Sequence, residues 1–486
     1  MTKQPQKYQK PPLLLIDAVI IALSVWFSFL LRFDGVIPKE KIPLILPSII
    51  IALVVTIPTF LLQRLYRISG SYVSLTDIPK ILASSLISTA LFAAVILIFR
   101  DQPYLIGFPR VALFLYGILL FLFIAVMRFS KRIYWQIIKR GLPSENKWRH
   151  LLSKNNFNQP EEIHTVLVTG GAGYVGSVLT RELLNRGYRV KVIDKLLFGD
   201  ESIKDLSKDP NFIFINGDIQ KESDIVRALE DVNAVIHLAA IVGDPACAAQ
   251  PDLTLKTNYL ATLKLAQLCR ERAIKRFIFA STCSNYGIGE DEKLTESSVL
   301  RPVSVYAESK IYTEKELIKM TEAQFMPIIF RFSTIYGLSP RMRFDLAINT
   351  MTMKAYTEQE ITIFGGNQWR PFIHVDDVAR ALIICLETPL GKITGQIFNL
   401  GGNQENYLIS EVGKIIKTIV PDIKVNEIMT EGDQRNYHVL FNKVQQVFNF
   451  CPTKTIKDGV LEIYQALQAG RFANPKDPKY YNYNPK

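Results

Sequence analysis

A short apolar run that breaks into a glycine-rich turn constrains the fold of this chain more than any other segment. Residues 165–176 read Thr-Val-Leu-Val-Thr-Gly-Gly-Ala-Gly-Tyr-Val-Gly, which places Gly170, Gly173 and Gly176 three residues apart. This pattern predicts a strand, a tight turn and the start of a helix whose free backbone amides bind a pyrophosphate. Asp194 ends the next apolar run, eighteen residues after Gly176. A carboxylate at that position is typical of a dinucleotide site, where it binds the adenosine ribose.

Short apolar runs alternate with amphipathic segments along the C-terminal two-thirds of the chain. The apolar runs are rich in Val, Ile and Phe and predict strands at 165–169, 190–194, 212–215, 234–238, 276–281 and 327–331. Segments with helical periodicity lie between them and include 176–186, 255–272 and 306–323. This alternation predicts a doubly wound α/β fold, in which helices cover both faces of a parallel sheet.

The first 140 residues have a different composition. Nearly uncharged stretches lie at 13–31, 43–62, 81–99 and 111–127. Each is about 20 residues long, enough for a helix to cross a hydrocarbon core of about 30 Å. A soluble domain with this composition would have little polar surface to face water. Residues 1–140 therefore predict a four-helix transmembrane domain. A cleavable signal peptide fits poorly, because the Phe-Leu-Leu-Arg-Phe-Asp segment at 29–34 is not a small-residue cleavage site.

Lysine and arginine residues set the expected orientation, because they stay on the cytoplasmic side of a membrane. They are more numerous before the first stretch, between the second and third, and after the fourth than in the opposite loops. We therefore expect a multi-pass protein of the cytoplasmic (inner) membrane, with its catalytic part in the cytoplasm. Basic residues that flank the membrane-spanning stretches favour anionic lipid headgroups, and this explains the net charge of +12 without a nucleic-acid partner. Membrane lipids are expected partners, and nucleic acid is not.

Two polar segments bracket the α/β part of the chain. Residues 141–163 are turn-rich and predict a linker to an α/β domain at 164–472. Residues 473–486, rich in Asn, Pro, Lys and Tyr, are typical of a mobile or docking extension. The five cysteines follow no paired metal-ligand spacing. We expect reduced thiols, no disulfide framework and no metal site.

Candidate catalytic side chains lie near the ends of predicted elements. Tyr306 and Lys310 stand four residues apart at the start of a predicted helix, so their side chains share one face. An ammonium beside a phenol lowers the phenol pKa, which helps the phenol to lose its own proton so that the phenolate can accept one from a sugar hydroxyl. Such a pair is common by chance. The interpretation gains support from residues 280–287, Ala-Ser-Thr-Cys-Ser-Asn-Tyr-Gly, which end the fifth predicted strand with hydroxyl groups that can share the proton.

Residues 164–465 resemble the extended short-chain dehydrogenase/reductase family, within it the nucleotide-sugar epimerases and dehydratases. The matching segments are Gly170-x-x-Gly173-x-x-Gly176, Asp194, Gly217-Asp218-Ile219, His237-Leu238-Ala239-Ala240, Asn258, Ser281-Thr282-Cys283-Ser284, Tyr306-x-x-x-Lys310 and the run from Arg370 to Val378. The resemblance implies a Rossmann-type sheet with a smaller C-terminal substrate-binding region, and NAD as the cofactor.

The resemblance also implies roles for individual residues. It implies that NAD is bound by Gly170, Gly173, Tyr174, Val175, Gly176, Asp194, Asp218, Ile219, Ala239, Ala240, Asn258, Tyr306 and Lys310. It implies catalysis by Thr282, Tyr306 and Lys310, with Tyr306 as the base and Thr282 also in contact with the substrate. Asp194 favours NAD because a carboxylate repels the 2′-phosphate of NADP, whereas the neighbouring Lys195 argues the other way.

The C-terminal third contains the expected substrate residues. The resemblance implies that Arg370 and Arg435 bind the diphosphate of the sugar nucleotide, a task that suits a guanidinium. Arg341 and Arg343 are weaker candidates, and we expect them on a solvated loop. Other side chains are expected to be structural rather than catalytic, namely His237, His374, Cys247 and Cys283.

The N-terminal part has a looser resemblance of its own. Leu65-Tyr66-Arg67, residues 71–77 and Pro109-Arg110 resemble the membrane region of polysaccharide-biosynthesis 4,6-dehydratases. Those proteins usually have an extra domain where this chain has a short linker, and their catalytic strand reads Thr-Asp-Lys where this chain has Thr-Cys-Ser. Cys283 and Ser284 supply neither a carboxylate nor an ammonium to eliminate water, so this departure favours 4-epimerisation through a 4-keto intermediate.

The sequence therefore predicts a membrane-anchored, NAD-dependent nucleotide-sugar epimerase that supplies surface polysaccharide or glycoconjugate synthesis. A UDP-sugar is the expected substrate. The open alternatives are a 4,6-dehydratase, a keto-reductase, an epimerase of a polyprenyl-diphosphate-linked sugar and a non-catalytic NAD-binding scaffold. A homodimer is usual for the family, and glycan-assembly enzymes are further candidate partners.

Overall fold

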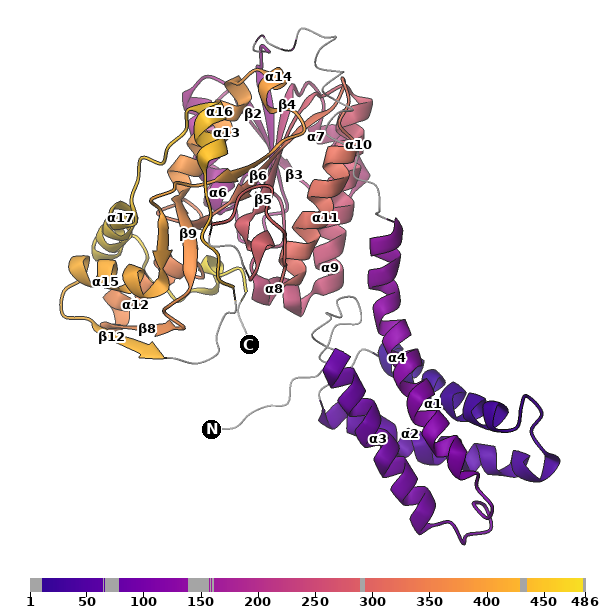
Figure 1. Cartoon of the computed structure of the whole chain (residues 1–486). Helices are drawn as coiled ribbons and strands as arrows, with labels where there is room; N and C mark the ends of the chain where they lie inside the picture. Colours follow the sequence, from indigo (N-terminus) through magenta and orange to yellow (C-terminus); the bar gives the residue numbers. More distant parts are fainter. Residues whose placement is uncertain are drawn as a thin grey trace. The chain divides into compact units, whose positions relative to one another are not determined.

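The chain divides into two compact units, Met1–Gly141 and Leu142–Lys486. The structure is a computed structural model and is shown in Figure 1. It describes residues 11–63, 65, 78–138, 157, 159, 161–288, 293–428 and 435–483, without the side chains of 11–13 and 128–138. Most of the predicted linker at 141–163 lies outside the described residues.

Long apolar helices form the described part of the first unit. They are α1 (Pro11–Arg32), α2 (Ile45–Leu62), α3 (Ile78–Ile98) and α4 (Arg110–Ile138), with the short η1 (Lys39–Leu44) before α2. All four long helices are long and apolar enough to cross a membrane. Helix α1 packs on α2 and α4, and α3 packs on the same two helices.

Small hydroxyl side chains lie at the contacts between these helices. Ser84 and Thr56 are fully buried, and Thr56 Oγ1 lies 2.8 Å from Tyr116 Oη within hydrogen-bond distance. Large apolar side chains face outward instead, since Val54 is 67% exposed and Phe114 is 71% exposed. Small polar contacts inside and apolar groups outside are typical of helices that pack within lipid.

A seven-stranded parallel sheet forms the centre of the second unit, with the order β10-β6-β5-β4-β1-β2-β3. Its strands are β1 (Thr165–Thr169), β2 (Arg189–Asp194), β3 (Phe212–Asn216), β4 (Ala234–His237), β5 (Arg276–Thr282), β6 (Met326–Phe332) and β10 (Ile397–Leu400). The predicted strands match β1 to β6 to within one residue at each end. The prediction of a doubly wound parallel sheet is confirmed, whereas strand β10 was not predicted.

Helices cover both faces of this sheet (Figure 1). They are α6 (Tyr174–Asn185), α7 (Glu222–Ala228), α8 (Asp244–Ala249), α9 (Pro251–Leu255), α10 (Thr262–Glu271), α11 (Val305–Lys319) and α13 (Val375–Glu387). Shorter helical turns are η4 (Lys204–Lys208), η5 (Lys256–Ala261) and η6 (Cys283–Tyr286). Each predicted helix thus exists, but 255–272 is divided, because η5 is a π-helical turn between α9 and α10.

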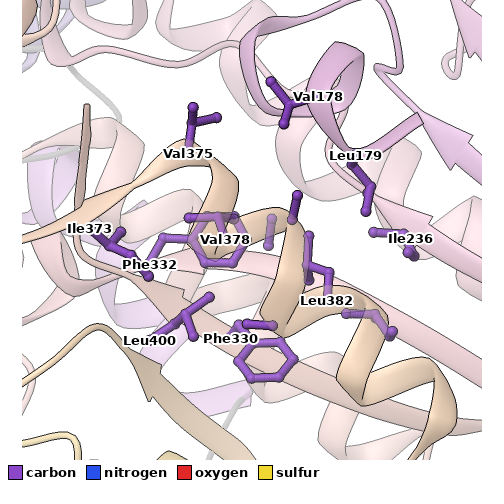
Figure 2. Packing of buried hydrophobic residues seen from close by; sticks show 14 of the residues in the cluster. Val178, Leu179, Ile236, Phe330, Phe332, Ile373, Val375, Val378, Leu382 and Leu400 are labelled. Atoms are coloured by element: carbon purple, nitrogen blue, oxygen red, sulfur yellow. The ribbon is translucent and has the colours of Figure 1, made fainter. Parts of the chain in front are cut away.

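Alternation along the strands explains why both faces are covered. Val166 and Val168 of β1 belong to one apolar cluster, and Leu167 between them belongs to another. Successive side chains of a strand point to opposite faces. The first cluster joins the sheet to α6 and α13, as Figure 2 shows for Leu179 and Leu382. The second joins it to α7, α10 and α11.

A smaller region follows β6 and packs around its own apolar cluster. It contains a three-stranded sheet, β11-β9-β7, and a parallel pair, β12-β8. The strands are β7 (Thr334–Tyr336), β8 (Glu360–Phe364), β9 (Trp369–His374), β11 (Asn406–Leu408) and β12 (Lys424–Ile428). The helices of this part of the chain are α12 (Ala347–Glu358), α14 (Leu390–Ile393), α15 (Ile409–Ile419), α16 (Asn442–Phe448), α17 (Ile456–Gln468) and η7 (Pro478–Tyr480).

The C-terminal tail packs against this unit over its described residues, 473–483. The Tyr480 ring lies against Phe344 and Phe472, at centroid distances of 5.6 and 5.5 Å. The Phe344 amide donates to the Tyr480 carbonyl at 2.9 Å, and the Asn482 amide donates to Asp345 at 3.3 Å. Of the two alternatives for this tail, a mobile or a docking extension, these contacts favour the docking one over the described residues.

A buried ion pair joins helix α11 to strands β5 and β6. Glu314 and Arg331 are each 2% exposed, and Arg331 Nε and Nη2 donate to the two carboxylate oxygens at 3.1 and 2.7 Å. Glu314 also accepts hydrogen bonds from Ser281 Oγ and, at 2.8 Å, from Asn285 Nδ2. Removing one partner of such a pair leaves the other charge buried without compensation.

We expect Glu314→Gln to lower the free energy of unfolding by about 3–5 kcal/mol, because it leaves the Arg331 guanidinium unneutralised. Glu316→Gln is the matched control on the same helix, since Glu316 pairs at 3.3 Å with the partly exposed Lys319. It should cost less than about 1 kcal/mol. Urea unfolding of the detergent-solubilised full chain measures both. Equal losses in the two variants would contradict this account of the ion pair.

Candidate active site

A large cavity of about 1140 Å³ opens at the carboxyl ends of the sheet strands. The predicted site residues that line it are Gly170, Gly173, Tyr174, Val175, Gly176, Asp194, Asp218, Ile219, Ala239, Ala240, Thr282, Tyr306, Lys310, Arg370 and Arg435. Ligands bind at this edge of open α/β sheets because loops and helix N-termini converge there. The structure thus brings the predicted site residues to one cavity, while their roles in binding and catalysis remain predictions.

The glycine turn brings the backbone unusually close to itself. Gly170 has φ +73°, and a Cβ on it would lie 2.8 Å from the backbone of Ala239. A Cβ on Gly176 would lie 2.2 Å from the carbonyl oxygen of Gly170. The N-terminus of α6 therefore meets the cavity with no side chain at Gly170, Gly173 or Gly176, which fits the pyrophosphate of NAD.

Asp194 supports the glycine turn from the end of β2. Its carboxylate accepts hydrogen bonds from the amides of Ala172 at 3.0 Å and Leu196 at 2.9 Å. Burial raises the pKa of Asp194, and these backbone bonds act in the opposite direction. Lys195 points its ammonium at Asp218, 2.8 Å away, so its charge is paired within the protein. The pairing weakens the argument that Lys195 serves a 2′-phosphate.

Asn258 is the predicted cofactor residue that does not line the cavity. Its side chain donates to the Ile241 carbonyl at 2.9 Å and accepts from the Ile241 amide at 2.8 Å. It lies in the π-helical turn η5, a distortion that often marks functional sites. Asn258 thus positions the backbone that follows Ala239 and Ala240 at the cavity wall.

Lys310, Tyr306 and Thr282 lie close together in the cavity wall. Lys310 Nζ donates to the Ala280 carbonyl at 2.8 Å and lies 6.0 Å from the Tyr306 ring centroid. Burial lowers the pKa of Lys310 to about 8. Burial also raises the pKa of the Tyr306 phenol, which is partly offset by Arg343 and by a hydrogen bond with Thr282.

Thr282 has a defined hydrogen-bonding direction. Its Oγ1 accepts from the Ser284 amide at 3.1 Å, so its own proton is available to the phenol or to a ligand. Tyr306 and Thr282 can therefore exchange a proton with one sugar hydroxyl between them, and the Lys310 charge favours the phenolate. This arrangement suits reversible oxidation of an alcohol.

Cys283 points away from the cavity. It is 1% exposed, its Sγ donates to the Arg331 carbonyl at 3.3 Å, and burial raises its pKa. Cys247 is buried as well, with a pKa raised to about 11 by burial. His237 hydrogen bonds to Thr169 and Thr262 inside the core, and burial lowers its pKa to about 3. The expectation that these side chains are structural agrees with their contacts.

The two predicted substrate arginines line one side of the cavity. Arg370 donates to the Trp369 carbonyl at 2.9 Å and to the Arg435 carbonyl, and its guanidinium lies 5.0 Å from the Tyr437 ring centroid. Arg435 forms an ion pair with Asp244 at 2.6 Å. Both guanidinium groups are thus held in place by other groups of the cavity wall.

The interpretation of Arg341 and Arg343 as residues of a solvated loop is wrong. Arg341 is 6% exposed and the Arg343 side chain is 11% exposed, and both line the cavity. Arg343 donates to both carboxylate oxygens of Asp345, at 2.9 and 2.8 Å. The local Ser-Pro-Arg-Met-Arg composition indicated a surface loop, but contacts with distant segments bury it.

Sequence reasoning also missed cavity residues from other segments, namely Asp244, Tyr437, Asn482 and Tyr483. Asp244 is the first residue of α8, in a Gly-Asp-Pro segment that is typical of a helix start. Asn482 and Tyr483 belong to the tail, whose polar composition gave no sign of a role at the site. The aromatic residues of that tail were the one available signal.

We expect Gly176→Ala to abolish NAD binding and to lower the melting temperature, because its Cβ would overlap the Gly170 carbonyl. Gly173→Ala is the matched control for stability, since its Cβ would lie 3.1 Å from the same atom and its φ is −78°. It should fold with a smaller loss of melting temperature. Thermal melts and titration with NADH fluorescence measure the two effects. Wild-type NAD affinity in Gly176→Ala would contradict this account of the turn.

We expect Lys310→Met to be inactive but more stable than the wild type at pH 7, by about 1–2 kcal/mol. The Lys310 pKa is about 8 in the folded protein against 10.5 usually, so below pH 8 the folded state holds an unfavourably buried charge. From pH 8 to 10.5 the folded protein has lost this proton while the unfolded chain retains it. The wild type therefore gains stability across this window, and the advantage of Lys310→Met shrinks. An advantage that grows with pH in urea unfolding would contradict the assignment.

Comparison with known proteins agrees with the geometry of the site. The family model for the NAD dependent epimerase/dehydratase family matches residues 166–401. UDP-glucuronate 4-epimerase of Thermodesulfobacterium geofontis is 31% identical over 309 residues, which cover 60% of this chain and 93% of that protein. dTDP-glucose 4,6-dehydratase of Neisseria gonorrhoeae is 27% identical over 338 residues, which cover 63% of this chain and 96% of that protein.

A solved structure gives the same result. The UDP-glucuronic acid 4-epimerase of Bacillus cereus, in complex with UDP-glucuronic acid and NAD, matches with a TM-score of 0.56 and 28% identity. The match covers 63% of this chain and 99% of that chain. Together with the glycine turn and the Tyr306–Lys310 pair, these similarities show that the chain belongs to the NAD-dependent epimerase/dehydratase family of nucleotide-sugar enzymes, of the short-chain dehydrogenase/reductase type.

Proposed function

We propose that the chain is a membrane-anchored, NAD-dependent epimerase that inverts C4 of a nucleotide sugar, with a UDP-sugar as the substrate. NAD, when bound at the glycine turn, would supply the hydride acceptor and donor for C4, so that no net oxidation occurs. Tyr306 takes the proton of the C4 hydroxyl, Thr282 shares it, and Lys310 stabilises the phenolate. Return of hydride to the other face of the 4-keto sugar gives the C4 epimer. Tyr306 then gives the proton back.

The observation that supports epimerisation most directly is the end of strand β5. A 4,6-dehydratase needs an acid and a base close to the hydride site to remove water across C5 and C6. The two residues after Thr282 do not supply them, since Cys283 is buried against the Arg331 carbonyl and Ser284 presents a hydroxyl to the cavity. A ketone that cannot lose water at C6 can still be reduced again at C4.

Arg370 and Arg435 are proposed to bind the diphosphate of the sugar nucleotide. Both line the cavity, and Tyr437, which also lines it, lies beside Arg370. The pairing of Arg435 with Asp244 holds its guanidinium in the cavity wall. An arriving diphosphate would compete with Asp244 for this guanidinium.

A second candidate, the 4,6-dehydratase, is favoured by one observation. Asp244 lines the cavity close enough to Tyr306 for its charge to raise the phenol pKa. Its Oδ2 pairs with Arg435, and among the described residues its buried Oδ1 has no hydrogen-bond partner. This carboxylate could act as the acid or base that positions 283 and 284 do not provide.

The four apolar helices support a membrane anchor. We propose that they span the cytoplasmic membrane, with the enzyme in the cytoplasm where nucleotide sugars are made. This location suits an enzyme that supplies surface polysaccharide or glycoconjugate synthesis. A sugar linked to polyprenyl diphosphate is the alternative substrate that the anchor would also suit.

Purified full-length protein should interconvert a pair of C4-epimeric UDP-hexoses without added NADH, as measured by NMR and mass spectrometry. Tyr306→Phe should lower turnover by at least about 1,000-fold while retaining NAD, because the base is lost and the fold is not. Product that is lighter by one water would contradict epimerisation, as would unchanged turnover in Tyr306→Phe.

Asp244→Asn separates the two candidates. An epimerase should retain C4 inversion in this variant, with a lowered KM because the diphosphate no longer competes with the Asp244 carboxylate for Arg435. A dehydratase that depends on Asp244 should lose its activity. GDP-, dTDP- and CDP-sugars, and a polyprenyl-linked sugar, complete the substrate panel.

A further inference from the structure

Arg341 is a buried cation, and two nitrogens of its guanidinium have no hydrogen-bond partner among the described residues. Its side chain lines the main cavity, and its Nε and Nη2 are both buried without a hydrogen-bond partner among the described residues. The guanidinium lies 3.9 Å from the centroid of the Phe198 ring. A buried guanidinium with unused donors is costly unless an anion meets it.

The neighbouring carboxylates are already engaged. Asp345 directs both of its oxygens to Arg343. Asp194 accepts from the amides of Ala172 and Leu196. Burial, and then the charge of Arg343, lower the Arg341 pKa to about 10, whereas Asp345 and Asp194 act to raise it. Two carboxylates thus lie near the Arg341 guanidinium, but its Nε and Nη2 donors remain without a partner among the described residues.

Two sets of contacts fix Arg341 beside the glycine turn. Ser339, two residues earlier, donates to the Tyr174 carbonyl at 2.7 Å and lies 3.2 Å from Ser177 Oγ, so the segment is bonded to the first turn of α6. On the other side, Phe198 lies in the loop after β2. That loop is bonded to the turn because Ser202 Oγ donates to the Ala172 carbonyl at 2.7 Å.

We propose that Arg341 binds a phosphate oxygen of the NAD pyrophosphate, opposite the amides of the glycine turn. The N-terminus of α6 attracts this group from one side, and a guanidinium is the side chain best suited to a phosphate on the other. Phe198 holds the guanidinium plane in position by stacking. This inference rests on the membership of the NAD-dependent family and not on the choice of epimerisation.

The proposal is tested by ligand binding to the full chain in detergent, after bound nucleotide has been removed. The ligands are NAD, ADP-ribose and adenosine, titrated by calorimetry. Arg341→Gln should weaken NAD and ADP-ribose by about 10- to 100-fold, since a charged hydrogen-bonded pair is lost. Adenosine should bind as it does to the wild type, because it has no phosphate. Arg341→Lys should recover part of the loss.

The matched control is Arg181→Gln. Arg181 lies on α6 and donates to the carbonyls of Ser177 and Ser202, but it does not line the cavity. NAD affinity should change little in this variant. Melting temperatures of all variants show which ones are folded.

Two results would overturn the proposal. Unchanged NAD affinity in Arg341→Gln would do so, and a parallel titration with UDP then shows whether Arg341 binds the sugar nucleotide instead. An equal loss of affinity for NAD and for adenosine would also do so, because it indicates a structural effect. The proposed reaction is tested separately, by measuring C4 inversion by Arg341→Gln at saturating NAD. Weaker NAD binding in this variant therefore does not bear on the choice of epimerisation.

Discussion

The buried carboxylate of Glu314 is the constraint on which the arrangement of the active site depends. It accepts two hydrogen bonds from Arg331 of β6 and further bonds from Ser281 and Asn285. One carboxylate thereby joins helix α11, strand β6 and the end of strand β5. Lys310 lies one turn before Glu314, and Thr282 directly follows Ser281. The same charge pair therefore holds Lys310 and Thr282, two proposed catalytic residues, in place relative to each other.

Charged groups are also buried in the cavity itself, with a different consequence. Lys310 is buried with a lowered pKa, and Arg341 is buried with unused donors. Neither arrangement favours folding by itself, and such departures gather at functional sites. Under the proposed function, these buried cations would serve anionic ligands and the Tyr306 phenolate, at the expense of stability. Arg343 and Asp345 connect this cavity to the tail, whose Asn482 amide donates to Asp345.

The sequence predicts the central sheet well because its strands are strongly apolar and lie between clear turns. Strand β10 was missed, since its four residues include Asn399, whose buried side chain bonds to Tyr286 and to the Leu440 carbonyl. No local pattern reveals such long-range partners. The glycine turn and the Tyr306–Lys310 pair predicted the cavity, because each is formed by residues that lie close together in the sequence. Arg341, Asp244 and the tail reach the cavity only through tertiary contacts.

The fate of a hydrogen isotope at C4 distinguishes inversion at C4 from elimination of water. A UDP-hexose deuterated at C4 is incubated with the full-length protein, and the product is analysed by NMR and mass spectrometry. Because the hydride removed from C4 returns to C4, the account predicts an inverted product of unchanged mass with deuterium still at C4. Deuterium at C6 in a product that has lost one water would contradict it, since that result requires elimination before the hydride returns.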